Sequence, residues 1–241
     1  MPRFFVGAVS GDQAVVTGED ARHMALSLRM RPGEAVTVCD SAGNDYQCVI
    51  QRIDPQQVVL QVAQVSRSAG EPSVQITLYQ ALSKGDKMDW IVQKAVELGV
   101  GRIVPVLTRR CISRPDARSL ERKVERWNRI AKEAAKQCGR GRSPQVEGLL
   151  ELPQALEQIR EDQLGIFFYE NATQPLRPVL EERLKESVSL LVGSEGGFDP
   201  TEAALAQEQG LCCLSLGSRI LRCETAPLAA LAAILYQAGD L

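Results

Sequence analysis

Two loops near the C-terminus carry the residue types best suited to chemistry. The first, residues 193–197, has the sequence GSEGG, and glycine lets a ligand approach the backbone closely because it has no Cβ. The acidic residue of this loop, Glu195, would repel a phosphate, so the loop suits a neutral or cationic ligand. The second loop, residues 216–226, contains two arginines and a carboxylate. Each loop taken alone could also be structural, the first as a tight turn and the second as an ion pair.

The sequence around these loops predicts the elements that position them. The apolar runs 190–192 and 211–216 predict two strands, each ending in one of the loops. Between them, Asp199 suits a helix N-cap, Pro200 the first helical position, and Glu202 the carboxylate of a capping box. A strand–helix–strand unit of this length has parallel strands. Both loops should therefore leave the carboxyl edge of one sheet, where open α/β folds bind small ligands.

The first third of the chain predicts a small β-domain. Alternating apolar and polar residues indicate half-buried strands, which one short helix at about residues 19–30 interrupts. The expected strands are 3–9, 13–17, 35–39, 46–53 and 57–65. Such a run of strands predicts a small barrel or sandwich, with the segment 68–73 (SAGEPS) as the linker that follows it.

From residue 74 onward, strands and helices alternate. The expected strands are 74–81, 103–107, 165–169 and 188–192, and the expected helices are 86–98, 116–138, 176–185 and 226–237. This alternation predicts an α/β domain with a mainly parallel sheet covered on both faces. Thr225 is suited to cap the last helix. Neither a GxGxxG nor a GxxxxGK[ST] motif is present, which argues against a conventional dinucleotide fold and a P-loop NTPase.

The composition predicts a cytoplasmic globular protein. No apolar run is long enough to span a membrane, and the first ten residues lack the pattern of a signal peptide. The cysteines number seven and form no CxxC pair, so we expect reduced thiols rather than disulfides. With a single histidine, His23, the chain has almost no material for a metal site.

The charges are strongly segregated along the chain. Residues 84–142 hold 16 basic and 7 acidic side chains, whereas residues 143–241 hold 6 basic and 15 acidic ones. The formal net charge of −2 conceals this asymmetry. A basic segment of this kind predicts a polyanionic partner, and its cations could follow a phosphate backbone.

Several motifs together resemble a known family. The chain resembles the SPOUT class of S-adenosylmethionine-dependent RNA methyltransferases, and within it the RsmE family of 16S ribosomal RNA uridine-N3 methyltransferases. The resemblance runs nearly from end to end, and its most specific parts are the two loops described first. In two places the chain departs from the family pattern, since Ser194 stands where proline is usual and Cys223 where threonine is common. The segments that carry the resemblance are 2–6, 23–29, 87–100, 126–140, 193–197 and 216–226.

The resemblance implies a fold and a set of partners. Residues 1–70 would form a PUA-like β-barrel that binds RNA, and residues 74–241 a SPOUT domain tied in a trefoil knot. The family is homodimeric, with each active site completed at the subunit interface. The implied substrate is 16S ribosomal RNA or the small ribosomal subunit, and the implied cofactor is S-adenosylmethionine, with no metal and no membrane involved.

The resemblance also implies roles for particular residues. Arg222 would stabilise negative charge on the uracil ring, and Glu195 or Glu224 would accept the N3 proton, because no histidine is present in these loops. The implied cofactor-binding residues are Tyr169, Glu170, Leu191, Gly193, Gly196, Gly197, Leu216, Gly217, Ile220, Leu221 and Thr225. The residues expected to contact RNA are Arg3, Arg29, Lys84, Lys87, Lys94, Arg109, Arg114, Arg126, Arg129, Lys136, Arg140 and Arg142.

Two other functions stay open at this point. The enzyme could share the fold and methylate another uridine or a transfer RNA. Alternatively, the chain could be an RNA-binding ribosome assembly factor without methyl transfer, for which the departure at Ser194 is the only support. Binding of S-adenosylmethionine would argue against the second of these.

Overall fold

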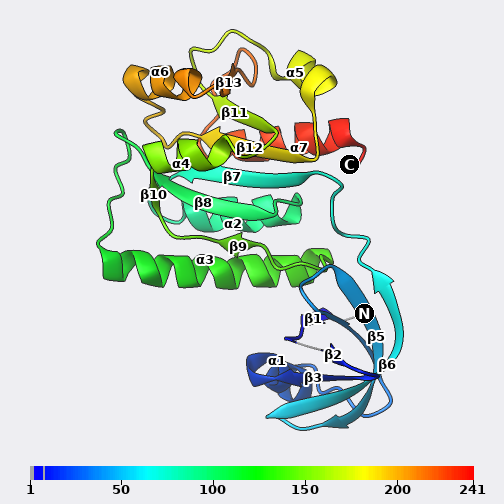
Figure 1. The fold of residues 1–241 in the computed structure, drawn as a ribbon. Coiled ribbons are helices and arrows are strands. Elements are labelled where there is room, and N and C mark those ends of the chain that lie inside the picture. Colours follow the sequence, from blue (N-terminus) through cyan, green and yellow to red (C-terminus); the bar gives the residue numbers. More distant parts are fainter. Residues whose placement is uncertain (1–2, 8) are drawn as a thin grey trace. The chain divides into compact units, whose positions relative to one another are not determined.

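The chain forms two compact units. The computed structural model describes residues 3–7 and 9–241, so the predicted strand 3–9 includes one position, Ala8, outside the described residues. The first unit comprises the residues up to Glu71 together with Ala135–Ser143, and the second comprises Pro72–Ala134 and Pro144–Leu241 (Figure 1). The first unit is therefore assembled from two separate stretches of sequence.

The first unit is built on a six-stranded sheet. The strand order is β1-β4-β5-β6-β3-β2, and all neighbours are antiparallel except β1 and β4. Alternate side chains of these strands face a common apolar core that includes Val36, Val38, Ile50 and Leu60. Five strands were expected here, and the first of them, 3–9, is replaced by two short strands, β1 and β2, which pair with different neighbours. The strands are β1 (Arg3–Phe5), β2 (Val9–Ser10), β3 (Gln13–Thr17), β4 (Ala35–Cys39), β5 (Asn44–Ile53) and β6 (Gln57–Arg67).

The helix expected at residues 19–30 is present in two parts. The helix α1 (Gly18–Arg22) continues into a π-helical turn, η1 (His23–Ser27), which is closed by a 2.9 Å hydrogen bond from the Leu28 N–H to the His23 carbonyl. The chain then leaves the turn through Arg29, which has a φ of +52°. The wider turn keeps the side chain of Met24 in the core of the unit.

The second unit contains a parallel sheet, as predicted. Its strand order is β10-β8-β7-β12-β11-β13, with β9 paired to β8, and every pair is parallel. The two strands that lead into the predicted pocket, β12 and β13, are parallel to each other but separated by β11. The strands are β7 (Gln75–Ala81), β8 (Arg102–Leu107), β9 (Gln145–Val146), β10 (Leu150–Glu151), β11 (Leu164–Phe168), β12 (Ser187–Val192) and β13 (Cys212–Leu214).

Helices cover both faces of this sheet (Figure 1). On one face, α4 and α6 bury their apolar side chains against residues of β7, β8, β11 and β12. On the other face, α7 packs against β12, α2 and α5. The short helix α4 was not foreseen. The helices are α2 (Lys87–Glu97), α3 (Ala117–Cys138), α4 (Leu152–Ile159), α5 (Leu176–Arg183), α6 (Pro200–Glu208) and α7 (Ala226–Ala238).

Local signals set the ends of the helices that flank the pocket. The predicted capping box of α6 is present, because the Asp199 side chain accepts from the Thr201 N–H while Glu202 reaches back to the Asp199 N–H. Thr225 occupies the N-cap position of α7, but its side chain makes no capping hydrogen bond. The start of α7 is instead held by the backbone, since the Ala226 N–H donates to the Arg222 carbonyl at 2.9 Å.

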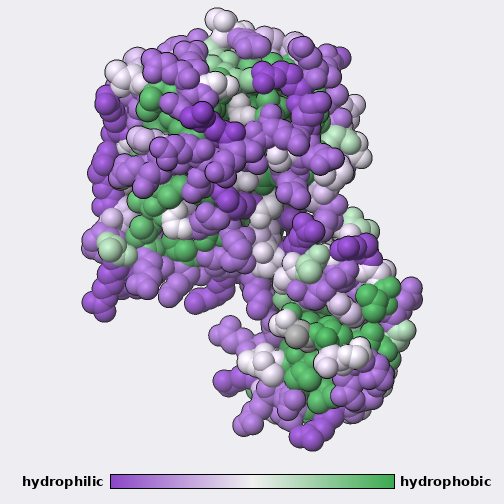
Figure 2. Space-filling view, viewed as in Figure 1, coloured by the Kyte–Doolittle hydropathy of each residue, from purple (hydrophilic) through white to green (hydrophobic). Residues whose placement is uncertain are grey.

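The surface of the described chain is mostly polar. In the space-filling view, hydrophobic residues appear in separate patches within a largely hydrophilic face (Figure 2). Among the described residues, no helix combines the length and the apolar character that crossing a membrane requires. All seven cysteines are free thiols.

Candidate active site

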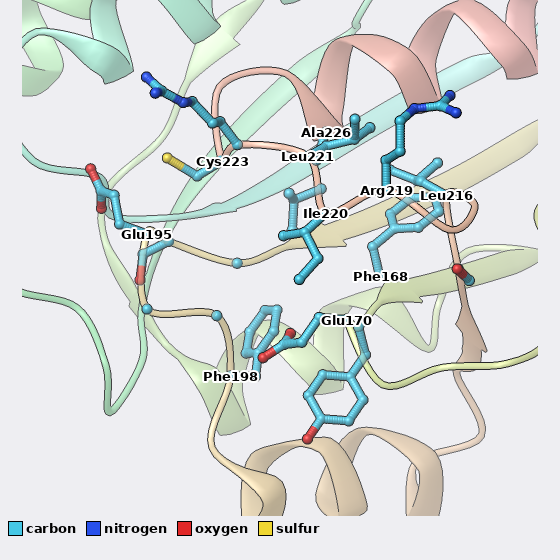
Figure 3. Close-up of a pocket in the computed structure, with 18 of the residues that line it drawn as sticks. Phe168, Glu170, Glu195, Phe198, Leu216, Arg219, Ile220, Leu221, Cys223 and Ala226 are labelled. Carbon is cyan, nitrogen blue, oxygen red and sulfur yellow. The ribbon is translucent and has the colours of Figure 1, made fainter.

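A cavity lies at the carboxyl ends of β11, β12 and β13. Its volume is about 550 Å³, and the residues that follow each of these strands line it. The predicted convergence of the loops 193–197 and 216–226 at one edge of the sheet is therefore confirmed. Figure 3 shows Glu170 and Ile220 facing each other across the cavity, with Glu195 and Cys223 together on one side of it.

The glycine loop is packed too closely to accept side chains. A Cβ on Gly197 would lie 2.6 Å from the Glu170 Oε1, and this residue has a φ of +64°. A Cβ on Gly193 would lie 3.1 Å from the ring of Phe198. The loop is closed by a 3.0 Å hydrogen bond from the Gly197 N–H to the Ser194 carbonyl. The segment is thus a tight turn, and it also forms one wall of the cavity.

A buried glutamine supports this turn from the neighbouring strand. Gln80, at the end of β7, is 0% exposed, and its Nε2 donates to the Gly193 carbonyl at 3.1 Å. On the other side of the turn, the Arg110 guanidinium donates to the Gly196 carbonyl at 3.1 Å. Sequence reasoning did not single out Gln80, and it considered Arg110 only as a possible phosphate contact. An amide within the apolar strand around Gln80 was the available signal, because a buried polar side chain needs a partner.

Both candidate proton acceptors are paired with one lysine. The Nζ of Lys87, at the start of α2, lies 3.0 Å from the Glu195 Oε1 and 3.5 Å from the Glu224 Oε2. The backbone N–H of Lys84 also donates to Glu195, at 3.0 Å. The Cys223 thiol donates to the Glu224 Oε2 at 3.1 Å. Three segments that are distant in sequence therefore meet in one charged cluster beside the cavity.

These contacts change the acidity of the cluster. Burial by itself would raise the pKa of Glu195, but hydrogen bonds from its own backbone, from Lys87 and from Lys84 bring that pKa below its ordinary value. The pKa of Glu224 is also lowered, chiefly by the hydrogen bond from Cys223. The pKa of Lys87 is raised, chiefly by its hydrogen bond to Glu195. At neutral pH the cluster therefore holds two carboxylates and one ammonium.

Arg222 is fixed by its backbone rather than by its side chain. The N–H groups of Thr225 and Ala226 donate to its carbonyl at 2.8 and 2.9 Å. Arg222 is exposed and is one of the residues that line the cavity, and the described residues provide no ion pair for it. Arg222 therefore remains available to a negatively charged group, as does the other arginine of this loop, Arg219, which is also exposed and lines the cavity.

The structure places most of the expected cofactor residues in the lining. Leu191 lies outside it, fully buried in β12 with its side chain in the core beneath α4 and α6. Thr225 and Glu224 also lie outside, next to lining residues. The lining includes two aromatic residues that the sequence did not single out, Phe168 and Phe198. The expected residues that line the cavity are Tyr169, Glu170, Gly193, Glu195, Gly196, Gly197, Leu216, Gly217, Ile220, Leu221 and Arg222.

The residues expected to contact RNA fall into two groups. In the first group, the charge already has a partner within the chain. Arg140 is only 3% exposed and pairs with Glu71, for example, and Lys136 pairs with Asp20 at 2.6 Å. The other pairs in this group are Arg3 with Asp45, Lys87 with Glu195, Lys94 with Glu97, Arg109 with Asp199, and Arg126 with Asp89.

In the second group, the side chain is exposed or bonded only to backbone. The guanidinium of Arg114 donates to the carbonyls of Thr108 and Arg109. The remaining members, which are exposed, are Arg29, Lys84, Arg129 and Arg142. Within the described part of the chain, no group of His, Cys, Asp and Glu side chains could hold a metal ion.

Comparison with known proteins identifies the class to which this fold and pocket belong. Residues 70–235 match a family described as an RNA methyltransferase domain, and residues 16–63 match one described as an RNA methyltransferase PUA domain. The second unit with its cavity, and the first unit with its six-stranded sheet, thus define an RNA methyltransferase with a PUA domain.

Individual relatives narrow this class. The chain is 33% identical over 229 residues to ribosomal RNA small subunit methyltransferase E of Bacillus subtilis, covering 92% of this chain and 89% of that one. It is 30% identical to the protein of the same name from Mycobacterium bovis, covering 93% and 87%. A crystal structure of this enzyme from Neisseria gonorrhoeae, bound to S-adenosyl methionine, matches with a TM-score of 0.88 and 31% identity over 97% and 96% of the two chains. The chain belongs to the ribosomal RNA small subunit methyltransferase E family.

Proposed function

We propose that the protein transfers a methyl group from S-adenosylmethionine to N3 of a specific uridine in 16S ribosomal RNA. The observation that carries this proposal is the cavity at the carboxyl ends of β11, β12 and β13, where a glycine turn, a carboxylate and an exposed arginine converge. The names of the relatives and the bound cofactor of the Neisseria gonorrhoeae structure support the same assignment.

The residues of the cavity fit this cofactor. Gly193, Gly196 and Gly197 line the cavity without side chains, so a ligand there can lie directly against the backbone. The Glu170 carboxylate faces the cavity and suits the positive charges of the cofactor, which carries no phosphate. Phe168 and the leucines of the loop 216–221 offer an apolar wall for a purine ring. Leu191, in the core beneath α4 and α6, and Thr225, at the start of α7, lie next to lining residues and support the loops from outside the cavity.

The chain's own residues account for the remaining chemistry. When bound, the cofactor supplies an electrophilic methyl group. The N3 atom of uridine becomes a good nucleophile only when its proton leaves, and the ring then gains negative charge. Arg222 is placed to stabilise that charge because it is exposed and lines the cavity. Either Glu195 or Glu224 can accept the proton, since both are ionised at neutral pH.

Both units contribute to binding of the RNA. We assign residues 1–70 to an RNA-binding domain, to which Ala135–Ser143 also belong in the fold, and the rest of residues 74–241 to the methyltransferase domain. The exposed cations Arg29, Lys84, Arg129 and Arg142 are the best phosphate contacts, because none of these side chains has a carboxylate partner in the described chain. The ion-paired members of the expected set can contribute only if RNA displaces their carboxylates.

The active form is a homodimer in this proposal. The helix α7 contains no charged residue, and Leu228, Ala229 and Ala232 on it are only partly buried. Tyr236 on the same helix is 76% exposed. Ile220, in the lining of the cavity, is 86% exposed, so a second subunit that covers this region could complete the site. The trefoil knot and a cytoplasmic location, where ribosomal subunits are assembled, also belong to this proposal.

The test is transfer of labelled methyl from S-adenosylmethionine to purified, unmodified small ribosomal subunits, followed by mass analysis of the nucleosides. We expect N3-methyluridine. A different methylated nucleoside would redirect the proposal to another target. Absence of transfer both to particles and to naked RNA, with the cofactor bound, would favour the ribosome assembly factor.

A further inference from the structure

The contacts of Lys87 in the charged cluster beside the cavity indicate a role beyond its expected contact with RNA. Its Nζ lies between the carboxylates of Glu195 and Glu224, at 3.0 and 3.5 Å, and 3.8 Å from the Cys223 Sγ. Lys87 opens α2, whereas its partners belong to the two loops that form the cavity walls. One side chain therefore links a rigid helix to both walls.

The two loops have few other links to each other on this side. The Ser83 hydroxyl donates to the Cys223 Sγ at 3.6 Å, and the Lys84 N–H donates to Glu195. Both contacts come from the segment that leads into α2, immediately before Lys87. No ion pair joins the loops directly within the described residues, because their charges in this cluster, Glu195 and Glu224, have the same sign. Without a cation between them, these two carboxylates would repel each other.

We propose that Lys87 is a positioning residue for methyl transfer, which holds the glycine loop and the loop of Arg222 at a fixed separation by bridging Glu195 and Glu224. This inference rests on the proposed function. It also explains why the charge of Lys87 is available only in part to RNA, since both its close ionic partners are within the chain. Arg222 directly precedes the Cys223–Glu224 pair. Its backbone is held by the start of α7, and the bridge adds the link from this segment to the glycine loop.

The bridge has a second consequence for the pH dependence of the reaction. The groups that face it are Lys87 from α2, Glu195 from the glycine loop, and Cys223 and Glu224 from the last loop. Burial raises the pKa of the Cys223 thiol, which therefore stays protonated and neutral. Lys87 stabilises the ionised form of both carboxylates, so its removal should raise their pKa values and move the acidic limb of the activity profile to higher pH.

The experiment compares Lys87→Met, Lys87→Arg and the wild type in methyl transfer, with kcat and the KM values for RNA and cofactor measured across pH. We expect Lys87→Met to lower kcat by about 10- to 100-fold, as displacement of reacting groups does. Its acidic limb should shift to higher pH. Lys87→Arg should recover most of kcat. The control is Lys185→Met, which removes an exposed lysine outside the cavity, and thermal unfolding of each variant checks the fold.

A double variant, Lys87→Met with Glu195→Gln, tests whether the lysine acts through its partner. We expect it to lose little more than the stronger single variant, because the two changes remove the same link. A Lys87→Met enzyme with unchanged kcat and pH profile but a raised KM for RNA would overturn the proposal and make Lys87 an RNA contact. Absence of activity in the wild type would contradict the proposed function instead.

Discussion

The two loops of the cavity are built in different ways. The glycine loop is held by close packing, since side chains at Gly193 and Gly197 would collide with Phe198 and Glu170. The loop 216–223 is open by contrast, with Ile220 86% exposed and Arg222 free of ion pairs in the described chain. The difference indicates a division of labour. The packed loop shapes the binding site, and the open loop presents the reactive cation to whatever enters it.

Arg222→Ala tests the open loop and should have the largest effect. We expect kcat to fall by about 100- to 1000-fold, which is the usual cost of removing a group that stabilises developing charge. Cofactor affinity, measured by calorimetry, should change little because the backbone of this residue is fixed by α7. Loss of cofactor binding together with turnover would contradict the assigned role.

Gly197→Val tests the packed loop. A branched side chain at a φ of +64°, with its Cβ 2.6 Å from Glu170, would displace the turn or the carboxylate. We expect cofactor affinity to fall by about 10- to 100-fold, because overpacking typically costs 1–3 kcal/mol. Gly148→Val is the matched control, since a Cβ there meets nothing within 4 Å. Normal cofactor binding by the Gly197 variant would remove this turn from the pocket.

Ser194→Ala tests how much an unpaired buried hydroxyl in the packed loop costs in stability. The Ser194 Oγ is buried and has no hydrogen-bond partner in the structure. Its removal should raise the free energy of unfolding by about 1 kcal/mol, because an unsatisfied buried hydroxyl is destabilising. Chemical denaturation measures this value. Ser215→Ala is the comparison, since the Ser215 hydroxyl is hydrogen-bonded to the backbone of Gly217 at 3.1 Å and its loss should destabilise.

Glu195→Gln tests the ionic link between the loops and should have the smallest effect on stability. The pKa of Glu195 is lowered in the folded protein, so its stabilising contribution is present above the unfolded pKa and is lost as pH falls through the folded pKa. We expect a difference below about 1 kcal/mol at neutral pH, since solvent screens a partly exposed pair. Urea unfolding from neutral to acidic pH should show the difference shrinking. A difference that grew as the pH fell would contradict this sign.

Local pattern was enough to predict the elements around the cavity. The strand β12 ends at the expected residue, Val192, and the capping box that starts α6 was read from Asp199, Pro200 and Glu202 alone. Both signals act over a few residues. The helix α4 also has a capping box, between Glu151 and Gln154, but its eight residues gave too short a periodic pattern to be noticed.

The contacts that complete the site were beyond local pattern. Lys87 meets partners 108 and 137 positions away, and nothing in the sequence near it marks them. The position of β11 between β12 and β13 depends on the order of strands in the whole sheet, which local pattern does not predict either. The same reason explains why the ion pairs of Lys136 and Arg140 were not predicted. No acidic residue interrupts the run 136–142, yet Lys136 and Arg140 pair with Asp20 and Glu71 from the earlier stretch of the first unit.

Those two ion pairs have a consequence for biosynthesis. The first unit needs Ala135–Ser143 as well as the residues up to Glu71. Its final residue, Ser143, is therefore added 72 residues after Glu71. At the usual speed of translation this interval is roughly 4 to 14 seconds. During that time Asp20, in α1, and Glu71, after β6, are without the cations with which they will pair. The first unit therefore cannot finish folding when its N-terminal sheet leaves the ribosome. It must wait until Ser143 has been made, and the second unit must wait until Leu241.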